Sequence, residues 1–214
     1  FEKSNAPIMK QILYLFFGIS LFFNGLTAKA DDYPVNKNID IKHYAFEINL
    51  SDSNDEIRGI ATITIDFKEV GVRNFRLDFV NQKADKENKG MAIDAITVGD
   101  QPISYTHQND EIILNLPSPS TKNQTIIFTI KYHGVPLDGL RIGKTKLGDR
   151  SFFNENWPNR ARHWLPTLDH PSDKATSEFK VKAPSHYKVI SNGLLVEESE
   201  LGNSMKLTHW KQSV

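Results

Sequence analysis

The residues best suited to chemistry gather in one polar stretch, residues 152–179, with the sequence FFNENWPNRARHWLPTLDHPSDKATSEF. The residues of this stretch that could in principle bind a metal are His163, Asp169, His170 and Asp173. A catalytic zinc site usually has a compact motif such as H-E-x-x-H on a helix, where both histidines share one face. No histidine of the chain is followed by glutamate, and prolines interrupt the cluster. The spacing therefore favours hydrogen-bonded scaffolding over a metal site.

Two other chemistries are open to residues in and beside this stretch. Glu155 and Asp169 are the pair of acids that would serve glycoside hydrolysis, which needs two carboxylates facing each other across a cleft. Trp157, Trp164 and Tyr187 would stack on sugar rings if they lay on an exposed β surface, although core or interface positions are favoured for tryptophan. The serine nucleophile motif G-x-S-x-G and the glycine-rich phosphate loops are absent from the sequence.

Three prolines predict that residues 152–179 form a long ordered loop, since each lacks an amide donor and restricts the residue before it. Two arginines, Arg160 and Arg162, would fasten such a loop by bidentate ion pairs with its acids. The prolines are Pro158, Pro166 and Pro171, and the acids are Glu155, Asp169 and Asp173. A loop so rich in tryptophan, phenylalanine and proline is not expected to lie wholly in water.

Around this loop, apolar and polar residues alternate with a period of two, which is typical of half-buried strands. The clearest case is residues 61–67, where Ala61, Ile63, Ile65 and Phe67 alternate with polar residues. Similar segments are residues 39–50, 75–79, 93–98, 112–116, 126–132, 179–181 and 205–210. No segment shows three helical turns with an apolar stripe. The sequence therefore predicts an all-β fold, a sandwich of mainly antiparallel strands packed face to face.

Composition excludes several classes of function. Lysine plus arginine and aspartate plus glutamate both number 26, so no net charge steers the chain toward nucleic acid or an anionic membrane. The absence of cysteine excludes thiol catalysis, thiolate zinc sites and disulfides within this chain.

Residues 1–30 are predicted to be upstream residues and a cleavable signal peptide. Met9 and Lys10 form a short positive start, Ile12–Phe23 is apolar, and small residues precede cleavage after Ala30. The apolar run is shorter than the roughly 20 residues of a transmembrane helix, so no stable membrane span is expected. Residues 31–38 would form an extension of the mature chain and residues 39–214 the β-sandwich domain. The protein is expected to be periplasmic or secreted.

The long loop carries a family resemblance. Residues 161–171, with the sequence ARHWLPTLDHP, are followed by Lys174, Ala175 and then Phe179. This run resembles the signature A-R-x-x-[FL]-P-x-x-D-x-P-x-x-K-A-x-F of the gluzincin zinc aminopeptidases, the family of alanyl aminopeptidase and leukotriene hydrolase. Residues 44–59, 132–134 and 183–193 are similar to other segments of that family. The resemblance spans about residues 40–210, and its fixed proline, aspartate, arginine and lysine positions make it specific.

The resemblance implies a saddle-like, all-β amino-terminal domain that covers the active site of a following thermolysin-like domain. The zinc ligands, the general-base glutamate and the substrate-binding G-x-M-E-N loop belong to that following domain. No catalytic residue and no metal ligand are therefore expected in this chain, and the catalytic domain is expected after residue 214. By resemblance, zinc in the parent enzyme polarises water for attack on the first peptide bond. The implied partners are the peptide substrate and the protein's own catalytic domain.

One substrate contact is implied for this domain. The family pattern T-Q-x-E-x-x-x-A-R places a glutamine near the substrate's amino-terminal residue, and counting back from Arg162 puts that position on Glu155. The family's acid falls on Trp157, so the sequence departs from the pattern at both positions. A carboxylate at 155 would favour a substrate ammonium, or it would pair with Arg160 or Arg162. The structural motif residues implied by the signature are Arg162, Pro166, Asp169, Pro171 and Lys174.

The predicted function is the substrate-cleft domain of an exported zinc metallo-aminopeptidase that removes amino-terminal residues from peptides. By itself this chain is expected to be inactive. The alternative is a stand-alone β-sandwich module that binds carbohydrate or protein. A chain that continues into G-x-M-E-N and H-E-x-x-H motifs would favour the enzyme.

Overall fold

The computed structural model describes residues 31–213, so the predicted signal peptide at residues 1–30 lies outside the described part. The compact unit that holds every described strand begins at Val35. This part of the chain contains thirteen strands, two short 3-10 helices and no α-helix, which confirms the all-β prediction. Within residues 31–213, no helix has the length and apolar character needed to cross a membrane.

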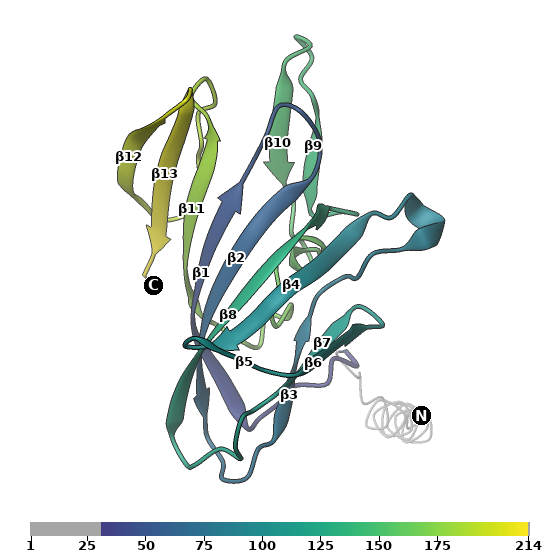
Figure 1. The fold of residues 1–214 in the computed structure, drawn as a ribbon, viewed down its shortest axis with the longest axis vertical. Helices are drawn as coiled ribbons and strands as arrows, with labels where there is room; N and C mark the ends of the chain where they lie inside the picture. Colours follow the sequence, from purple (N-terminus) through teal and green to yellow (C-terminus); the bar gives the residue numbers. More distant parts are fainter. Residues whose placement is uncertain (1–30, 214) are drawn as a thin grey trace, which may run out of the picture. The chain divides into compact units, whose positions relative to one another are not determined.

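The largest sheet has eight strands in the order β12, β13, β11, β1, β2, β8, β4, β5 (Figure 1). Their bounds are β1 Ile39–Asn49, β2 Ile57–Phe67, β4 Gly90–Val98, β5 Gln101–Pro102, β8 Gln124–Val135, β11 Thr176–Pro184, β12 Leu194–Gly202 and β13 Met205–Gln212. β2 shows the alternation best, because its buried and half-exposed residues alternate from Gly59 to Phe67.

Most strand pairs of the large sheet are antiparallel, as predicted, but one parallel pair makes the sheet mixed. β1 and β11 run parallel, with Phe46 opposite Phe179, while β2 is antiparallel to β1 on the other side. Tight hairpins make neighbouring strands antiparallel, but β11 reaches β1 only after a long connection through other sheets. After such a long connection, the direction of β11 is determined by tertiary packing and not by a hairpin turn. The saddle-like curvature stays a prediction.

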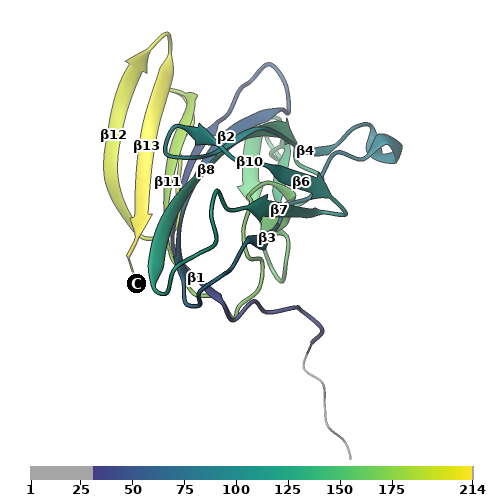
Figure 2. The same ribbon diagram turned by 60° about the horizontal axis from the view of Figure 1, so that its bottom comes forward.

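Two smaller sheets complete the fold, and they lie on one side of the large sheet (Figure 2). One contains β3 Asn74–Asp78, β7 Glu111–Asn115 and β6 Tyr105–Gln108, and the other contains β9 Leu140–Lys144 and β10 Arg150–Asn154. Phe75 of β3 packs edge-on against Phe67 and Phe128 of the large sheet, with ring centroids 5.7 and 5.0 Å away. These contacts join the sheets across a common hydrophobic core.

The sequence pattern misses some strands. β10 begins before the predicted loop and extends into it, and the edge strand β12 carries consecutive exposed apolar residues instead of an alternating pattern. The Asn109-Asp110 pair is a turn signal in the sequence, and these two residues connect β6 and β7 with φ of 54° and 63°. Asparagine and aspartate tolerate this left-handed region better than most residues.

Candidate functional site

The segment that carries the predicted site residues connects β10 to β11 and is held at both ends. After β10, the amide of Glu155 donates to the carbonyl of Gly139 at 2.7 Å. The amide of Arg160 then donates to the carbonyl of Asn156 at 2.9 Å, and the short helix η2 follows at Ala161–His163. Gly139 has a φ of 75°, and a Cβ atom there would lie 2.2 Å from the carbonyl oxygen of Arg160. Only glycine therefore fits under this turn.

Arg162 and Asp169 close the segment on itself. The Arg162 Nε atom donates to Asp169 Oδ2 at 3.0 Å, and the Arg162 amide donates to the same oxygen at 3.2 Å. The Arg162 Nη2 atom also donates to the carbonyl of Asp169 at 3.2 Å. Several charge-assisted bonds between the same two residues fix both the distance and the orientation of the loop.

Asp78 ties this loop to β3. Its side chain is 1% exposed, and its Oδ2 atom accepts the amide of Asp169 at 2.9 Å and lies 3.6 Å from Arg162 Nη2. Arg76 Nη2 lies 3.3 Å from the other carboxylate oxygen. The backbones of Asp78 and Thr167 also exchange hydrogen bonds of 2.7 and 3.2 Å. The buried carboxylate thus has two arginines to balance its charge, as burial of an ion requires.

The five signature residues do not share one environment. Pro166 is buried, while Arg162 and Asp169 are partly buried in the network just described. Pro171 and Lys174 are exposed, and Lys174 has no ion pair with any other described residue. Arg162 and Asp169 therefore bind each other and Pro166 is buried, whereas Pro171 and Lys174 lie on the surface of the domain.

Glu155 pairs with neither nearby arginine. Arg160 lies 3.5 Å from Asp138 and Arg162 binds Asp169, so the predicted alternative of an ion pair with Glu155 is not realised. The half-buried carboxylate accepts the amide of Trp157 at 3.3 Å and has no ion pair within residues 31–213. Its charge is therefore only partly satisfied by the domain.

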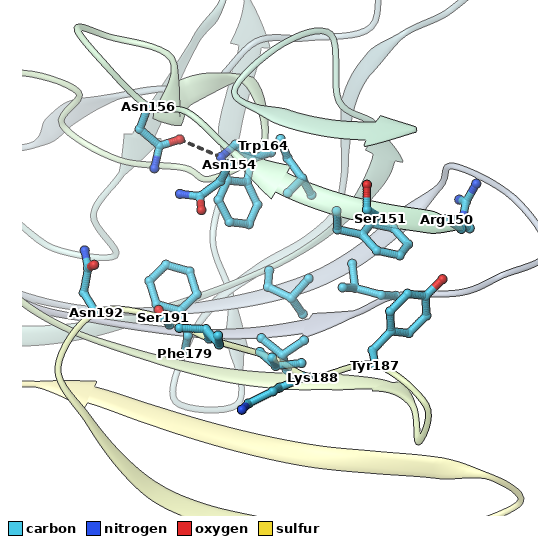
Figure 3. Close-up of a pocket in the computed structure, with 17 residues that line it drawn as sticks. Arg150, Ser151, Asn154, Asn156, Trp164, Phe179, Tyr187, Lys188, Ser191 and Asn192 are labelled. Atoms are coloured by element: carbon cyan, nitrogen blue, oxygen red, sulfur yellow. Dashed lines mark hydrogen bonds between the residues drawn. The ribbon is translucent and has the colours of Figure 1, made fainter. Parts of the chain in front are cut away.

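A pocket of about 420 Å³ lies beside this segment, between β10 and residues 187–192 (Figure 3). Asn154 and Asn156 line it, but Glu155 between them does not. This is expected in an extended segment, where alternate side chains point in opposite directions. The pocket and the carboxylate of Glu155 are therefore separate features.

The three aromatic residues considered for sugar stacking do not lie together on one exposed surface. Trp164 is only 6% exposed, packs on Phe179 with ring centroids 6.1 Å apart, and donates from its indole nitrogen to Asn156 Oδ1 at 3.0 Å. Tyr187 lines the same pocket, and its hydroxyl donates to Asp52. Trp157 is 76% exposed and does not line the pocket. The core interpretation is thus right for Trp164.

The four residues considered for a metal have different partners. Asp169 binds Arg162, while a hydrogen bond joins His170 to Ser172 and the carboxylate of Asp173 accepts the amide of Ile41. Burial lowers the pKa of His163 and raises the pKa of Asp173. No group of three or more metal-ligating side chains occurs in the described part of the chain.

Glu178 forms a second titratable cluster, on β11. Its carboxylate lies 2.8 Å from His209 Nε2 and 3.4 Å from His43 Nε2, so it joins β13 to β1 across β11. Lys211 Nζ is 3.9 Å away. Burial raises the pKa of Glu178, but the hydrogen bonds to His209 and His43 outweigh burial and leave the pKa below its usual value. These contacts stabilise the pairing of β11 with β13 and with β1.

Sequence reasoning missed Asp78, Gly139 and Asn156, which position the loop. The alternation of β3 predicts a solvent-facing side chain at 78, and only the loop that folds over it makes the side chain buried. Gly139 offered a weak signal, because an isolated Asp-Gly pair marks a turn without naming its tertiary contact.

Comparisons with known proteins agree with this arrangement. The family model for the Peptidase M1 N-terminal domain matches residues 40–214. An M1 zinc metallopeptidase from Deinococcus radiodurans aligns with a TM-score of 0.69 at 24% identity, over 83% of this chain and 39% of that one. A variant of the Deinococcus radiodurans enzyme, bound to the substrate Tyr-Ser-Ala, gives 0.67 at 21%, over 83% and 40%.

A two-domain M1 zinc metallopeptidase variant bound to L-tryptophan gives a TM-score of 0.70 at 22% identity, over 84% of this chain and 40% of that one. At these identities the structures establish the likeness of the fold. This chain spans about two fifths of the length of those proteins. The family match covers most of the chain, and the chain belongs to the Peptidase M1 N-terminal domain family.

Proposed function

We propose that this chain is the amino-terminal domain of an exported zinc metallo-aminopeptidase and forms one wall of its substrate cleft. The observation that carries the proposal is the family match over residues 40–214. The anchored loop supports it, because Arg162 and Asp169 stabilise the segment in which the family signature lies. The peptide Tyr-Ser-Ala bound to a relative supports peptides as the class of substrate.

The zinc of the proposed enzyme belongs to the domain that would follow this one. Residues 31–213 offer no group of three ligand side chains that fits a zinc ion. When bound in a peptidase, zinc polarises the scissile carbonyl and lowers the pKa of water. The role of the present residues is to shape the cleft.

Glu155 is the residue of this domain proposed to touch substrate. Its carboxylate has one backbone donor and no cation among the described residues, so it has capacity for a charge-assisted bond to the substrate's free ammonium group. The hydrogen bond from its amide to Gly139 and the Arg162–Asp169 bonds restrain its backbone before substrate arrives. Such preorganisation lowers the entropic cost of binding.

The proposal is tested by comparing the whole protein with a fragment of residues 31–214. We expect the whole protein to bind one zinc per chain and to release amino-terminal residues from short peptides. We expect the fragment to do neither. A fragment that binds stoichiometric zinc and hydrolyses peptides would overturn the proposal, and so would a whole protein that does neither.

We also propose export to the periplasm or the medium, on the evidence of the apolar run Ile12–Phe23 and the small residues around Ala30. Fractionation of expressing cells and amino-terminal sequencing test this point. An exported protein that begins at Asp31 is expected. A protein in the cytosolic fraction with residues 9–30 intact would contradict export.

A further inference from the structure

The pocket beside β10 has two facing walls and an apolar floor (Figure 3). β10 forms one wall through Arg150, Ser151, Phe152 and Asn154, and residues 187–192 form the other. The floor is apolar and is made by residues of the large sheet, β9 and the loop: Ile48, Leu50, Leu140, Trp164, Phe179 and Val181. The hollow therefore lies between the two-stranded sheet and the large sheet.

β10 has a free edge on this side. It pairs only with β9, from Arg150 opposite Lys144 to Asn154 opposite Leu140, and the described residues contain no third strand in that sheet. A two-stranded sheet is marginally stable by itself, and an edge strand offers unpaired amides and carbonyls to another strand. β10 contributes four residues to the pocket whereas β9 contributes only Leu140, so the edge of β10 borders the hollow.

Two exposed polar side chains at the walls have no partner in the described part of the chain, whereas Arg150 and Tyr187 bind Asp55 and Asp52. The side-chain amides of Asn154 and Asn192 have no hydrogen bond to any other residue in the part of the chain that the structure describes. An amide offers two donors and an acceptor, which is the complement of a peptide backbone. The floor below them belongs to the hydrophobic core or packs against it.

We infer that an extended segment of the same protein, from the part that follows residue 214, adds as a third strand to the free edge of β10. One of its apolar side chains fills the pocket between Phe152 and Phe179. Main-chain hydrogen bonds to β10 provide affinity and the pocket selects the side chain, as in other cases of strand addition. This inference rests on the proposed function, which supplies the following polypeptide.

Two observations favour a segment of the protein itself over a peptide in solution. The floor is continuous with the permanent core, since Ile48, Leu140 and Trp164 are all buried core residues, so a constant cover suits it better than an exchanging ligand. The related structures are also much longer than this chain, which covers 39–40% of them. A tethered segment binds at high effective concentration without further contacts.

The whole protein with Ser151→Cys tests the inference. Ser151 lies on the wall of the pocket, and the described domain contains no native cysteine to compete for label. Ser118→Cys, at an exposed turn, is the matched control. Labelling with a thiol reagent is followed by mass spectrometry of the peptide that contains each site. We expect Cys at 151 to react at least about tenfold more slowly than Cys at 118 under native conditions, and equally in denaturant.

A photoreactive label on the same cysteine identifies what covers it. Crosslinks to a segment after residue 214 of the same molecule are expected. The inference would be overturned if the two cysteines reacted equally fast under native conditions, or if Cys at 151 became protected only after peptide substrate was added. Crosslinks between two copies of the protein would also overturn it. Hydrogen exchange of the unmodified protein gives an independent test, since amides of β10 on both edges should exchange slowly. Zinc content and peptidase activity are measured separately, so a failure of the proposed function can be distinguished from a failure of this inference.

Discussion

Arg162 Nε donates to Asp169 Oδ2 at 3.0 Å, and the amide of Asp169 in turn donates to the buried carboxylate of Asp78. This relationship joins a proline-rich loop to the end of β3. It makes the loop a fixed part of the domain, although the loop contains only one short helical turn.

Arg162→Ala should lower the free energy of unfolding by about 3 kcal/mol, because it leaves Asp169 without its cation and Asp78 with one arginine fewer. Urea unfolding of the domain measures the change. Arg141→Ala is the matched control, since Arg141 is exposed and has no ion pair among the described residues. Equal stability of Arg162→Ala and the native chain would show that the network contributes nothing.

Gly139→Ala should destabilise the domain more than Gly148→Ala. Both glycines have positive φ, so both substitutions carry backbone strain of about 1 kcal/mol. The Cβ atom at 139 would also meet the carbonyl of Arg160 at 2.2 Å, whereas nothing lies within 4 Å at 148. We expect an additional loss of about 2 kcal/mol at 139 from this overlap. Thermal unfolding compares the two variants, and indistinguishable melting temperatures would contradict the close contact.

Glu178 should give the domain a pH-dependent stability. Its pKa is below the ordinary value of 4.5, because hydrogen bonds to His209 and His43 outweigh the effect of burial. The ionised form therefore stabilises the folded state above pH 4.5, and this contribution is lost as the pH falls through the lowered pKa. The native chain should exceed Glu178→Gln in stability at neutral pH, and the difference should shrink in acid.

Urea midpoints measured from pH 7 to pH 3 test the dependence on Glu178. Glu69→Gln is the control, because the Glu69 side chain is exposed and has no polar contact in the described structure. A difference between native and Glu178→Gln chains that stays constant over this range would argue against the lowered pKa.

Much of the fold follows from local pattern. Alternation in Ala61, Ile63, Ile65 and Phe67 predicts β2, and the Asn109-Asp110 pair predicts the hairpin between β6 and β7. The parallel pairing of β1 with β11 was not predictable in this way. It depends on contacts such as Phe46 with Phe179, whose ring centroids are 5.1 Å apart although the residues are distant in sequence.

The site was predictable in part. The spacing of Arg162 and Asp169 suggested an ion pair, and the structure contains it. The role of Asp78 was hidden, because its neighbours in β3 predict an outward-facing side chain and only tertiary packing buries it. The pocket beside β10 had no sequence signal, since its lining comes from several separate strands and loops.

Glu155 provides the most direct test of the claim that this domain forms a wall of the substrate cleft. In the whole protein, Glu155→Gln removes a charge but keeps the shape of the side chain, so the KM for peptides with a free amino terminus should rise about tenfold or more through loss of a charge-assisted bond. Zinc content and unfolding midpoint should stay unchanged, and Glu69→Gln should behave like the native enzyme. Unchanged KM and kcat across several peptides would contradict the account.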